Sequence, residues 1–343
     1  MPTESDGLPG KLAVVCRNVA PVRLEPDSDS EQDTQVALGQ RAFVLEESGD
    51  WTRIETWDGC TGWVNGNAVT LISDGDAAYA STGAVAQVHE LFAPLHCSAN
   101  SDSPIITQAV FGSLVETVGQ CGGWLEVRIP RGTAAVSGIT HPDTLLTGQD
   151  LTLNLIQDRP IDPFQRAFVR ADAVDLLDAS VIPAAQEWCH SDQREESQRI
   201  LNQVQDDVPD MTAPDPAALI STAMKFVGVP YLWGGTTPFG IDCSGFVQLV
   251  HRFHLYNLPR NSRTQAADPR GVRVTRDQLR SGDLVFFGNG RDPDHDAVRH
   301  VGIALCPDSF IHSAGISGVA VTTFDSPRYR DIYWGARRLR RPD

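Results

Sequence analysis

The N-terminal half of the chain consists of short runs in which apolar and polar residues alternate, separated by turn residues. Segments 40–64 (QRAFVLEESGDWTRIETWDGCTGWV) and 112–129 (GSLVETVGQCGGWLEVRI) both follow this pattern. Alternation with period two indicates half-buried β-strands, and the Gly, Asp and Ser residues between the runs indicate tight turns. Short strands at such close spacing predict small β-barrels.

The two strand-rich segments are copies of one unit. Shifting the chain by 73 residues places residues 20–30 (APVRLEPDSDS) over 93–103 (APLHCSANSDS) and Trp51 over Trp124 without a gap. Self-similarity at one fixed offset indicates repeated structural modules. The second copy carries an insertion, roughly Pro130 to Phe164, before its pattern resumes.

The C-terminal part has a helical rather than a strand-like beginning. Asp215 and Pro216 offer an N-cap and a first helical residue, and residues 217–228 carry apolar side chains at helical spacing up to Gly228. The polar, Gln/Glu-rich stretch before it is typical of a connector. The predicted division is a first barrel at 1–77, a second barrel with insertion at 78–179, a linker at 180–212 and a third domain at 213–343.

A cysteine is predicted at the start of the next helix. The helix should run from about Ser244, and Cys243 directly precedes it. Unpaired N–H groups and the positive end of the helix dipole favour a thiolate, so we expect the pKa of Cys243 to lie below the value of about 8.5 for a free thiol. The alternative is a small buried residue without reactivity, which the polar neighbours Asp242 and Ser244 disfavour.

Two histidines follow on a predicted hairpin. The runs around His300 and His312 read as antiparallel strands joined by a tight turn at 306–308. With three residues in that turn, His312 lies opposite Gly302 and one diagonal step from His300, so the two imidazoles point the same way. A four-residue turn would place them on opposite faces.

The C-terminal domain resembles the NlpC family of bacterial cell-wall cysteine peptidases, which have a reduced papain-like fold. The matching pieces, between about Ala213 and Arg340, are YLWGG, DCSGF, LPRNSRTQA, SGDLVFF, HVGIA, IHSAG and WGARRL. The repeated unit resembles bacterial SH3-like barrels. The predicted fold class is therefore α+β: a papain-like NlpC domain preceded by two small SH3-like β-barrels.

The resemblance implies roles for four residues. Cys243 corresponds to the nucleophile, His300 to the general base and later acid, and His312 to the polar residue that orients His300. Tyr231 corresponds to the tyrosine that supports the oxyanion hole together with the Cys243 backbone N–H. Asp283 corresponds to a structural position that caps a turn. The family implies no cofactor.

Two SH3-like modules before such a domain resemble the γ-D-glutamyl-L-diamino-acid endopeptidases, which act on short peptidoglycan-derived peptides with a free N-terminal L-Ala. In that group the acidic residue before the nucleophile reads the ammonium group, which implies this role for Asp242, helped by Ser244. Trp233 and Arg260 are expected to line the same cleft. The other interpretation of Asp242 is a helix N-cap.

One feature departs from the related enzymes, in which a tyrosine from a barrel completes the amine pocket. His96 stands where such modules often carry Tyr, and Cys60 stands where the pattern D-G-Y-x-G-W would place one. The sequence therefore leaves open which barrel residues reach the substrate.

Composition excludes some partners. Asp plus Glu outnumber Lys plus Arg by 44 to 28, giving a net charge of −16, which argues against nucleic acid and against an anionic membrane surface. The chain has seven cysteines and no C-x-x-C motif, which suits a reducing compartment. No secretory signal pattern begins the sequence, so we expect a cytoplasmic protein, with non-classical export as the alternative.

A metal site is the weaker interpretation of one acidic loop. Asp292, Asp294, His295 and Asp296 crowd together, but their spacing matches no ligand pattern, so a solvated loop is favoured and no metal is expected. Two rival functions remain open: a non-catalytic cell-wall-binding protein, and an amidase or transpeptidase that uses the same Cys and His residues.

Overall fold

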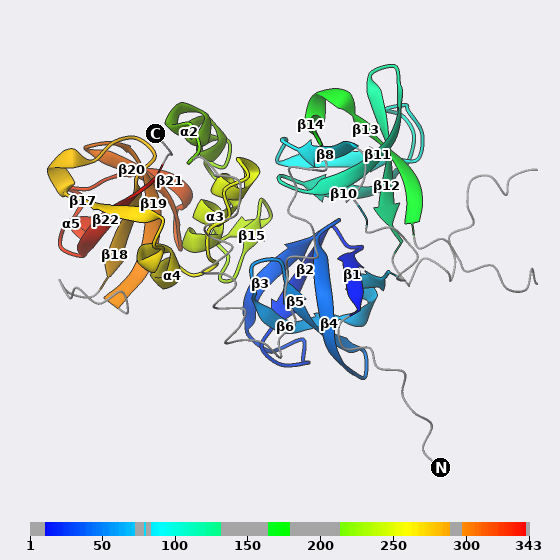
Figure 1. Ribbon diagram of the computed structural model, residues 1–343, viewed down its shortest axis with the longest axis horizontal. Coiled ribbons are helices and arrows are strands. Elements are labelled where there is room, and N and C mark those ends of the chain that lie inside the picture. The colour runs from blue at the N-terminus through cyan, green and yellow to red at the C-terminus, as the bar shows by residue number, and fades with distance from the viewer. Residues whose placement is uncertain are drawn as a thin grey trace, which may run out of the picture.

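The computed structural model describes residues 11–72, 79, 84–131, 164–178, 213–288 and 297–340. Two β-barrels and a larger mixed domain are visible in Figure 1. The first barrel has the strand order β3-β2-β6-β5-β4-β1-β7. Its strands are β1 (Leu12–Val15), β2 (Val19–Arg23), β3 (Gln32–Ala37), β4 (Arg41–Ser48), β5 (Trp51–Thr56), β6 (Thr61–Asn65) and β7 (Val69–Leu71).

The second barrel repeats this topology, with the order β10-β9-β13-β12-β11-β8-β14. Its strands are β8 (Ala84–Val88), β9 (Phe92–His96), β10 (Ile105–Val110), β11 (Leu114–Cys121), β12 (Trp124–Pro130), β13 (Phe164–Arg170) and β14 (Val174–Asp178). Strands β2, β3 and β4 begin 73 residues before β9, β10 and β11, which confirms the internal repeat.

The insertion in the second barrel begins and ends within one strand pair. β12 and β13 are antiparallel from Trp124↔Arg170 to Pro130↔Phe164, so the chain leaves the barrel and returns at the same edge. The predicted insertion lies outside the described residues except at its two ends, and the predicted linker at 180–212 lies wholly outside them.

The C-terminal domain is a six-stranded antiparallel sheet packed against helices, with the strand order β17-β22-β18-β19-β20-β21. This confirms the α+β class. The strands are β17 (Gly271–Val274), β18 (Leu284–Gly288), β19 (Val298–Cys306), β20 (Ser309–Ala314), β21 (Gly318–Thr323) and β22 (Tyr333–Leu339), with a two-stranded hairpin of β15 (Thr236–Thr237) and β16 (Gly240–Ile241). The helices are α2 (Pro216–Met224), α3 (Cys243–Phe253), α4 (Ser262–Ala267) and α5 (Pro327–Arg330). None of the described helices is long and apolar enough to cross a membrane.

Helix α2 begins as predicted but ends four residues early. Asp215 caps it by accepting a hydrogen bond from the Ala218 N–H at 3.0 Å. After Met224 the chain turns to pair with β21, and the Gly228 N–H donates to the Val319 carbonyl at 2.9 Å. Gly228 has a φ of +89°, a left-handed conformation that suits glycine. Pairing with the sheet therefore ends the helix.

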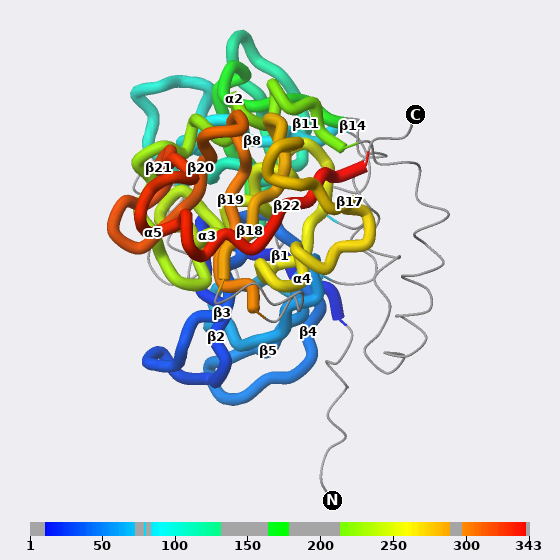
Figure 2. The backbone as a smooth tube through the Cα atoms, turned by 90° about the vertical axis from the view of Figure 1, so that its left-hand side faces the viewer, coloured from blue at the N-terminus to red at the C-terminus, as the bar shows by residue number. Residues whose placement is uncertain are grey.

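Both barrels dock on the helical side of the C-terminal domain, one above and one below it in the view of Figure 2. Phe111 of the second barrel is buried in the core of the C-terminal domain, with ring centroids 5.0 Å from Phe226 and 4.4 Å from Phe253. The Arg252 guanidinium lies 4.1 Å from the ring centroid of Trp57 in the first barrel. Aromatic packing and a cation–π contact thus fix the barrels against the helices.

Candidate active site

Cys243 is the first residue of α3 and lies against the sheet. Asp242 is the N-cap, and its carboxylate accepts a hydrogen bond from the Gly245 N–H at 2.7 Å. Backbone hydrogen bonds from Val301 and Ser244 reach the buried Cys243 thiol. The Ser313 hydroxyl donates to the Ile241 carbonyl at 2.6 Å. These contacts fix the start of α3 beside β19 and β20.

The hairpin of β19 and β20 brings the two histidines together. Ile303 pairs with Ile311, which is the expected register and places His312 opposite Gly302. The turn itself differs from the expectation: Cys306 pairs with Ser309, and a register shift between residues 304 and 306 absorbs the extra residue. His300 Nε2 and His312 Nδ1 are 2.7 Å apart.

Gly302 makes room for this pair. A Cβ at residue 302 would lie 3.1 Å from the Cβ of His312 and 2.8 Å from the Ile311 carbonyl oxygen. Both separations are shorter than ordinary van der Waals contacts, so a larger residue at this position would displace His312.

The hydrogen bonds determine which imidazole nitrogen can serve the thiol. Because Nε2 of His300 contacts His312, Nδ1 is the one ring nitrogen of His300 left to accept a proton from a thiol. His312 Nε2 lies 3.0 Å from the Thr322 hydroxyl on β21. Sequence reasoning missed Thr322, because no motif marks it and only the β20–β21 register places it near His312.

Aromatic rings enclose the histidines. Tyr329 on α5 stacks on His300 with a centroid distance of 5.7 Å and meets His312 edge-on at 4.9 Å. Phe287 lies 5.9 Å from His300, and Phe310 lies 4.8 Å from His312. The pair is therefore shielded from water on several sides. This packing was not predicted either.

This enclosure sets the protonation of the site. Burial, with a smaller contribution from the Arg328 cation, lowers the pKa of His300 to about 4. Burial, followed by His300 and Arg328, lowers the pKa of His312 to about 3. Burial and then Asp242 raise the pKa of Cys243 to about 12. Near neutral pH the thiol is thus protonated and both imidazoles are neutral.

The expected lowering of the Cys243 pKa is therefore wrong. The backbone hydrogen bonds from Val301 and Ser244 do favour the thiolate, but the loss of hydration outweighs them.

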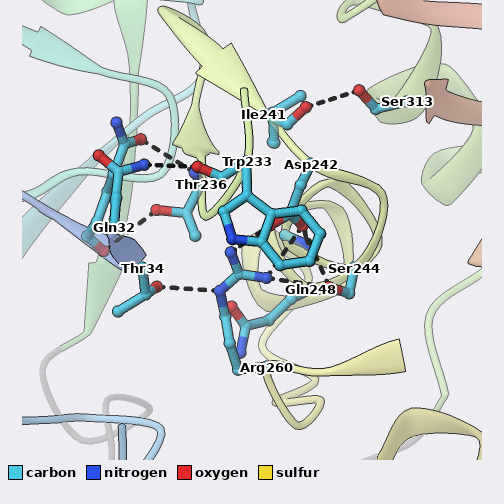
Figure 3. A network of polar contacts seen from close by, with 12 residues as sticks. Gln32, Thr34, Trp233, Thr236, Ile241, Asp242, Ser244, Gln248, Arg260 and Ser313 are labelled. Atoms are coloured by element: carbon cyan, nitrogen blue, oxygen red, sulfur yellow. Dashed lines mark hydrogen bonds and ion pairs between the residues drawn. The ribbon is translucent and has the colours of Figure 1, made fainter. Parts of the chain in front are cut away.

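A second polar network surrounds Asp242, the residue before Cys243, and is drawn in Figure 3. Arg260 is only 4% exposed and donates to the two carboxylate oxygens of Asp242 at 3.0 and 2.5 Å. It also donates to the Ser244 hydroxyl at 3.0 Å and to the Thr34 hydroxyl of the first barrel at 3.0 Å. Asp242, Ser244 and Arg260 are thus brought together as predicted. Asp242 is also the N-cap of α3.

Trp233 and Tyr231 precede the β15–β16 hairpin. Trp233 is 62% exposed, and its carbonyl accepts a hydrogen bond from the Gln32 side chain of the first barrel at 2.9 Å. Burial, followed by Cys243 and Asp242, raises the pKa of Tyr231 to about 12, so its hydroxyl stays protonated beside the thiol. That position suits the oxyanion role, which stays a prediction.

The first barrel supplies one wall of the network. Gln35 accepts a hydrogen bond from the Thr236 N–H at 3.0 Å, and the Gln248 amide donates to Asp58 at 2.9 Å. Burial raises the pKa of Asp33, while the nearby Arg260 cation opposes this effect. The carboxylates of Asp33 and Asp58 therefore lie around the same guanidinium as Asp242, and the sequence analysis assigned neither of them to the site.

Cys60 and His96, the two positions that depart from the related enzymes, lie in different surroundings. Cys60 lies next to Asp58, where burial and that carboxylate raise the pKa of the thiol. His96 lies within the second barrel, 5.2 Å from Trp124 by ring centroids and 3.0 Å from the Ser103 carbonyl. Cys60 is thus the one close to the network.

Asp283 has a structural role in the C-terminal domain. Asp283 accepts a hydrogen bond from the Arg280 N–H at 2.8 Å and pairs with Arg338, as expected for a turn cap. Among the described residues no group of three or more His, Cys, Asp or Glu side chains could hold a metal ion. The acidic loop at 292–296 lies outside the described residues.

Known proteins resemble this chain in both parts. The model of the NlpC/P60 family matches residues 228–338, and that of the bacterial SH3 domain matches residues 18–70. A Bacillus cereus protein named gamma-D-glutamyl-L-lysine dipeptidyl-peptidase is 38% identical over 135 residues, which cover 39% of this chain and 38% of that relative.

Two further proteins extend the comparison. A crystal structure of an NlpC/P60 family protein from Bacillus cereus superposes with a TM-score of 0.70 over 96% of this chain and 99% of the other, at 20% identity, so the whole three-part fold is shared. An Escherichia coli protein named probable endopeptidase NlpC is 36% identical over 140 residues, covering 37% of this chain and 87% of that relative. With this similarity, the shared fold and the cysteine at the start of α3, the chain belongs to the NlpC/P60 family.

Proposed function

We propose that the protein is a cysteine endopeptidase that hydrolyses the bond between γ-D-Glu and a diamino acid in peptidoglycan stem peptides with a free N-terminal L-Ala. The observation that carries this proposal is that two carboxylates of the first barrel, Asp33 and Asp58, lie around Arg260, which binds the Asp242 that directly precedes Cys243. The name of the Bacillus cereus relative, a γ-D-glutamyl-L-lysine dipeptidyl-peptidase, supports the same bond.

The first half-reaction uses the protonated thiol and neutral imidazole of the resting site. The Cys243 sulfur attacks the γ-carbonyl carbon of D-Glu while its proton moves to His300 Nδ1. The developing oxyanion is stabilised by the Tyr231 hydroxyl and the Cys243 backbone N–H. His300 then returns the proton to the departing amine of the diamino acid, which leaves a thioester on Cys243.

Water completes the reaction. His300 takes a proton from the water as its oxygen attacks the thioester carbonyl, and the thiol leaves with that proton. The product is L-Ala-D-Glu, and the resting enzyme is restored. Attack on the Cys243 thioester by an amine in place of water would form a new amide and release the thiol, which would make the same site a transpeptidase.

Selection of a free amine rests on the surplus of negative charge around Arg260. The Asp242 carboxylate is already engaged by Arg260, Ser244 and the α3 backbone. Within the described residues no hydrogen bond reaches the Asp33 carboxylate, which is half-buried on the barrel side of the same network. Asp33, backed by Asp58, is therefore the carboxylate best placed for the ammonium, with Asp242 fixing the geometry.

Peptides that differ only at the amine test the proposal. L-Ala-γ-D-Glu-meso-diaminopimelate, its Lys counterpart and their N-acetylated forms are incubated with the protein, and the products are identified by mass spectrometry. We expect L-Ala-D-Glu from the free-amine peptides only, and no product with Cys243→Ala. Equal cleavage of the acetylated peptides would refute amine selection, and activity of Cys243→Ala would refute the mechanism.

A matched pair of variants locates the amine site. Asp33→Asn should raise KM for the free-amine peptide at least tenfold with a small change in kcat, because about 1.4 kcal/mol of charge attraction corresponds to a factor of ten. Asp29→Asn, on an exposed turn of the same barrel, is the control and should leave KM unchanged. An unchanged KM for Asp33→Asn would remove that residue from the amine site.

A further inference from the structure

We propose that Thr322 is a positioning residue that fixes the proton arrangement of the His300–His312 pair, so that Nδ1 of His300 is free to accept a proton from Cys243. The inference rests on the proposed cysteine-peptidase function and adds a fourth member to its hydrogen-bonded chain. Thr322 acts through His312 and does not touch the substrate.

Strand pairing brings Thr322 to His312. His312 pairs with Ala320 across β20 and β21, so Thr322, two residues further along β21, lies on the same face one diagonal step away. His312 is 1% exposed, and its Nε2 is 3.0 Å from the Thr322 Oγ1. Among the described residues no other hydrogen-bond partner reaches this nitrogen.

The proton arrangement follows from the bonding pattern. A neutral imidazole carries one N–H donor and one acceptor nitrogen. For His300 Nδ1 to accept the thiol proton, its Nε2 must carry the hydrogen and donate to Nδ1 of His312. His312 must then carry its own proton on Nε2, and that N–H needs an acceptor. The Thr322 hydroxyl oxygen is in the right place to accept it.

The requirement is strictest when His300 becomes positively charged. The imidazolium has two donors, so its Nε2–H can only donate, and His312 can only be protonated at Nε2. The charged and titratable groups that face the pair are Arg328 and Tyr329 on α5 and Cys243 on α3. None of these groups replaces the Thr322 hydroxyl as an acceptor. The Arg328 cation destabilises protonated His300, and Tyr329 contacts His312 through its ring.

Removing the hydroxyl tests the proposal through kinetics. Thr322→Val keeps the side-chain shape and leaves a buried N–H without an acceptor, so kcat should fall about 5- to 150-fold with KM within twofold. The acidic limb of the pH profile of kcat/KM should move to lower pH, because protonated His300 loses support. Thr322→Ser keeps the hydroxyl and should restore both kcat and the position of the acidic limb. Thr323→Val changes an exposed neighbour in β21 and should behave as wild type.

A spectroscopic readout separates positioning from folding. In protein labelled with ¹⁵N-histidine, long-range ¹H–¹⁵N spectra at pH 7 should show His300 and His312 protonated at Nε2, and Thr322→Val should shift His312 toward the Nδ1 form. A wild-type His312 protonated at Nδ1 would overturn the proposal. So would a Thr322→Val variant with kcat within twofold of wild type, or a folded Thr322→Ser variant as slow as Thr322→Val. These spectra need no substrate, so they test the inference even if the protein cleaves none of the stem peptides.

Discussion

Replacing Arg260 by Met should test the buried ion pair between Arg260 and Asp242, which the first barrel contacts through Thr34. The substitution keeps an unbranched side chain of similar length but removes the guanidinium that binds both oxygens of Asp242, the Ser244 hydroxyl and Thr34 of the first barrel. Asp242 would then be left 7% exposed, with its charge uncompensated at the first turn of α3.

The magnitude follows from the burial of both partners. Their side chains are 4% and 9% exposed, so this pair belongs to the class in which loss of one partner costs about 3–5 kcal/mol. At about 2–4 °C per kcal/mol, Tm should fall by roughly 6–20 °C. Asp242→Asn should also destabilise the protein, because the buried Arg260 guanidinium then loses the opposite charge and keeps only one of the two acceptor oxygens.

Thermal unfolding of the two single variants and the double variant Asp242→Asn/Arg260→Met provides a double-mutant cycle. Because neither charge is left alone in the double variant, its loss of stability should be smaller than the sum of the single losses by at least about 1.4 kcal/mol. Two results would show that Asp242 and Arg260 are not a buried, coupled pair. One is a double variant whose loss of stability equals the sum of the two single losses, and the other is a decrease in Tm of less than about 2 °C for Arg260→Met.

The remaining predictions concern the histidines and the second barrel. Burial lowers the pKa of His300 to about 4, and Arg328→Gln removes the cation that adds a smaller part to this lowering. Neutral His300 is the base, so activity is lost as pH falls through this pKa; in the variant the acidic limb of kcat/KM should lie at higher pH. Phe111→Ala should cost about 3–5 kcal/mol and loosen the second barrel from Phe226 and from Phe253 of α3, as measured by Tm and faster limited proteolysis between the domains. An unchanged pH limb or proteolysis rate would contradict the respective prediction.

Local patterns carried the sequence predictions that proved correct. The 73-residue offset, the N-cap and proline at the start of α2, and Cys243 at the start of α3 each depend on residues within a few positions of one another or on a repeated local pattern. The register of the His300 hairpin belongs here too, because a short turn leaves few ways to pair its strands.

Contacts between distant segments were decided by the tertiary structure. Thr34 meets Arg260 across 226 residues, Phe111 enters the core of the C-terminal domain, and Thr322 reaches His312 through a strand pair that no motif marks. The sequence by itself determined the family and the fold class, and it named the candidate residues for the chemistry. Only the tertiary structure decided their protonation, since the direction in which the Cys243 pKa moves depends on burial by parts of the chain that lie far away in sequence.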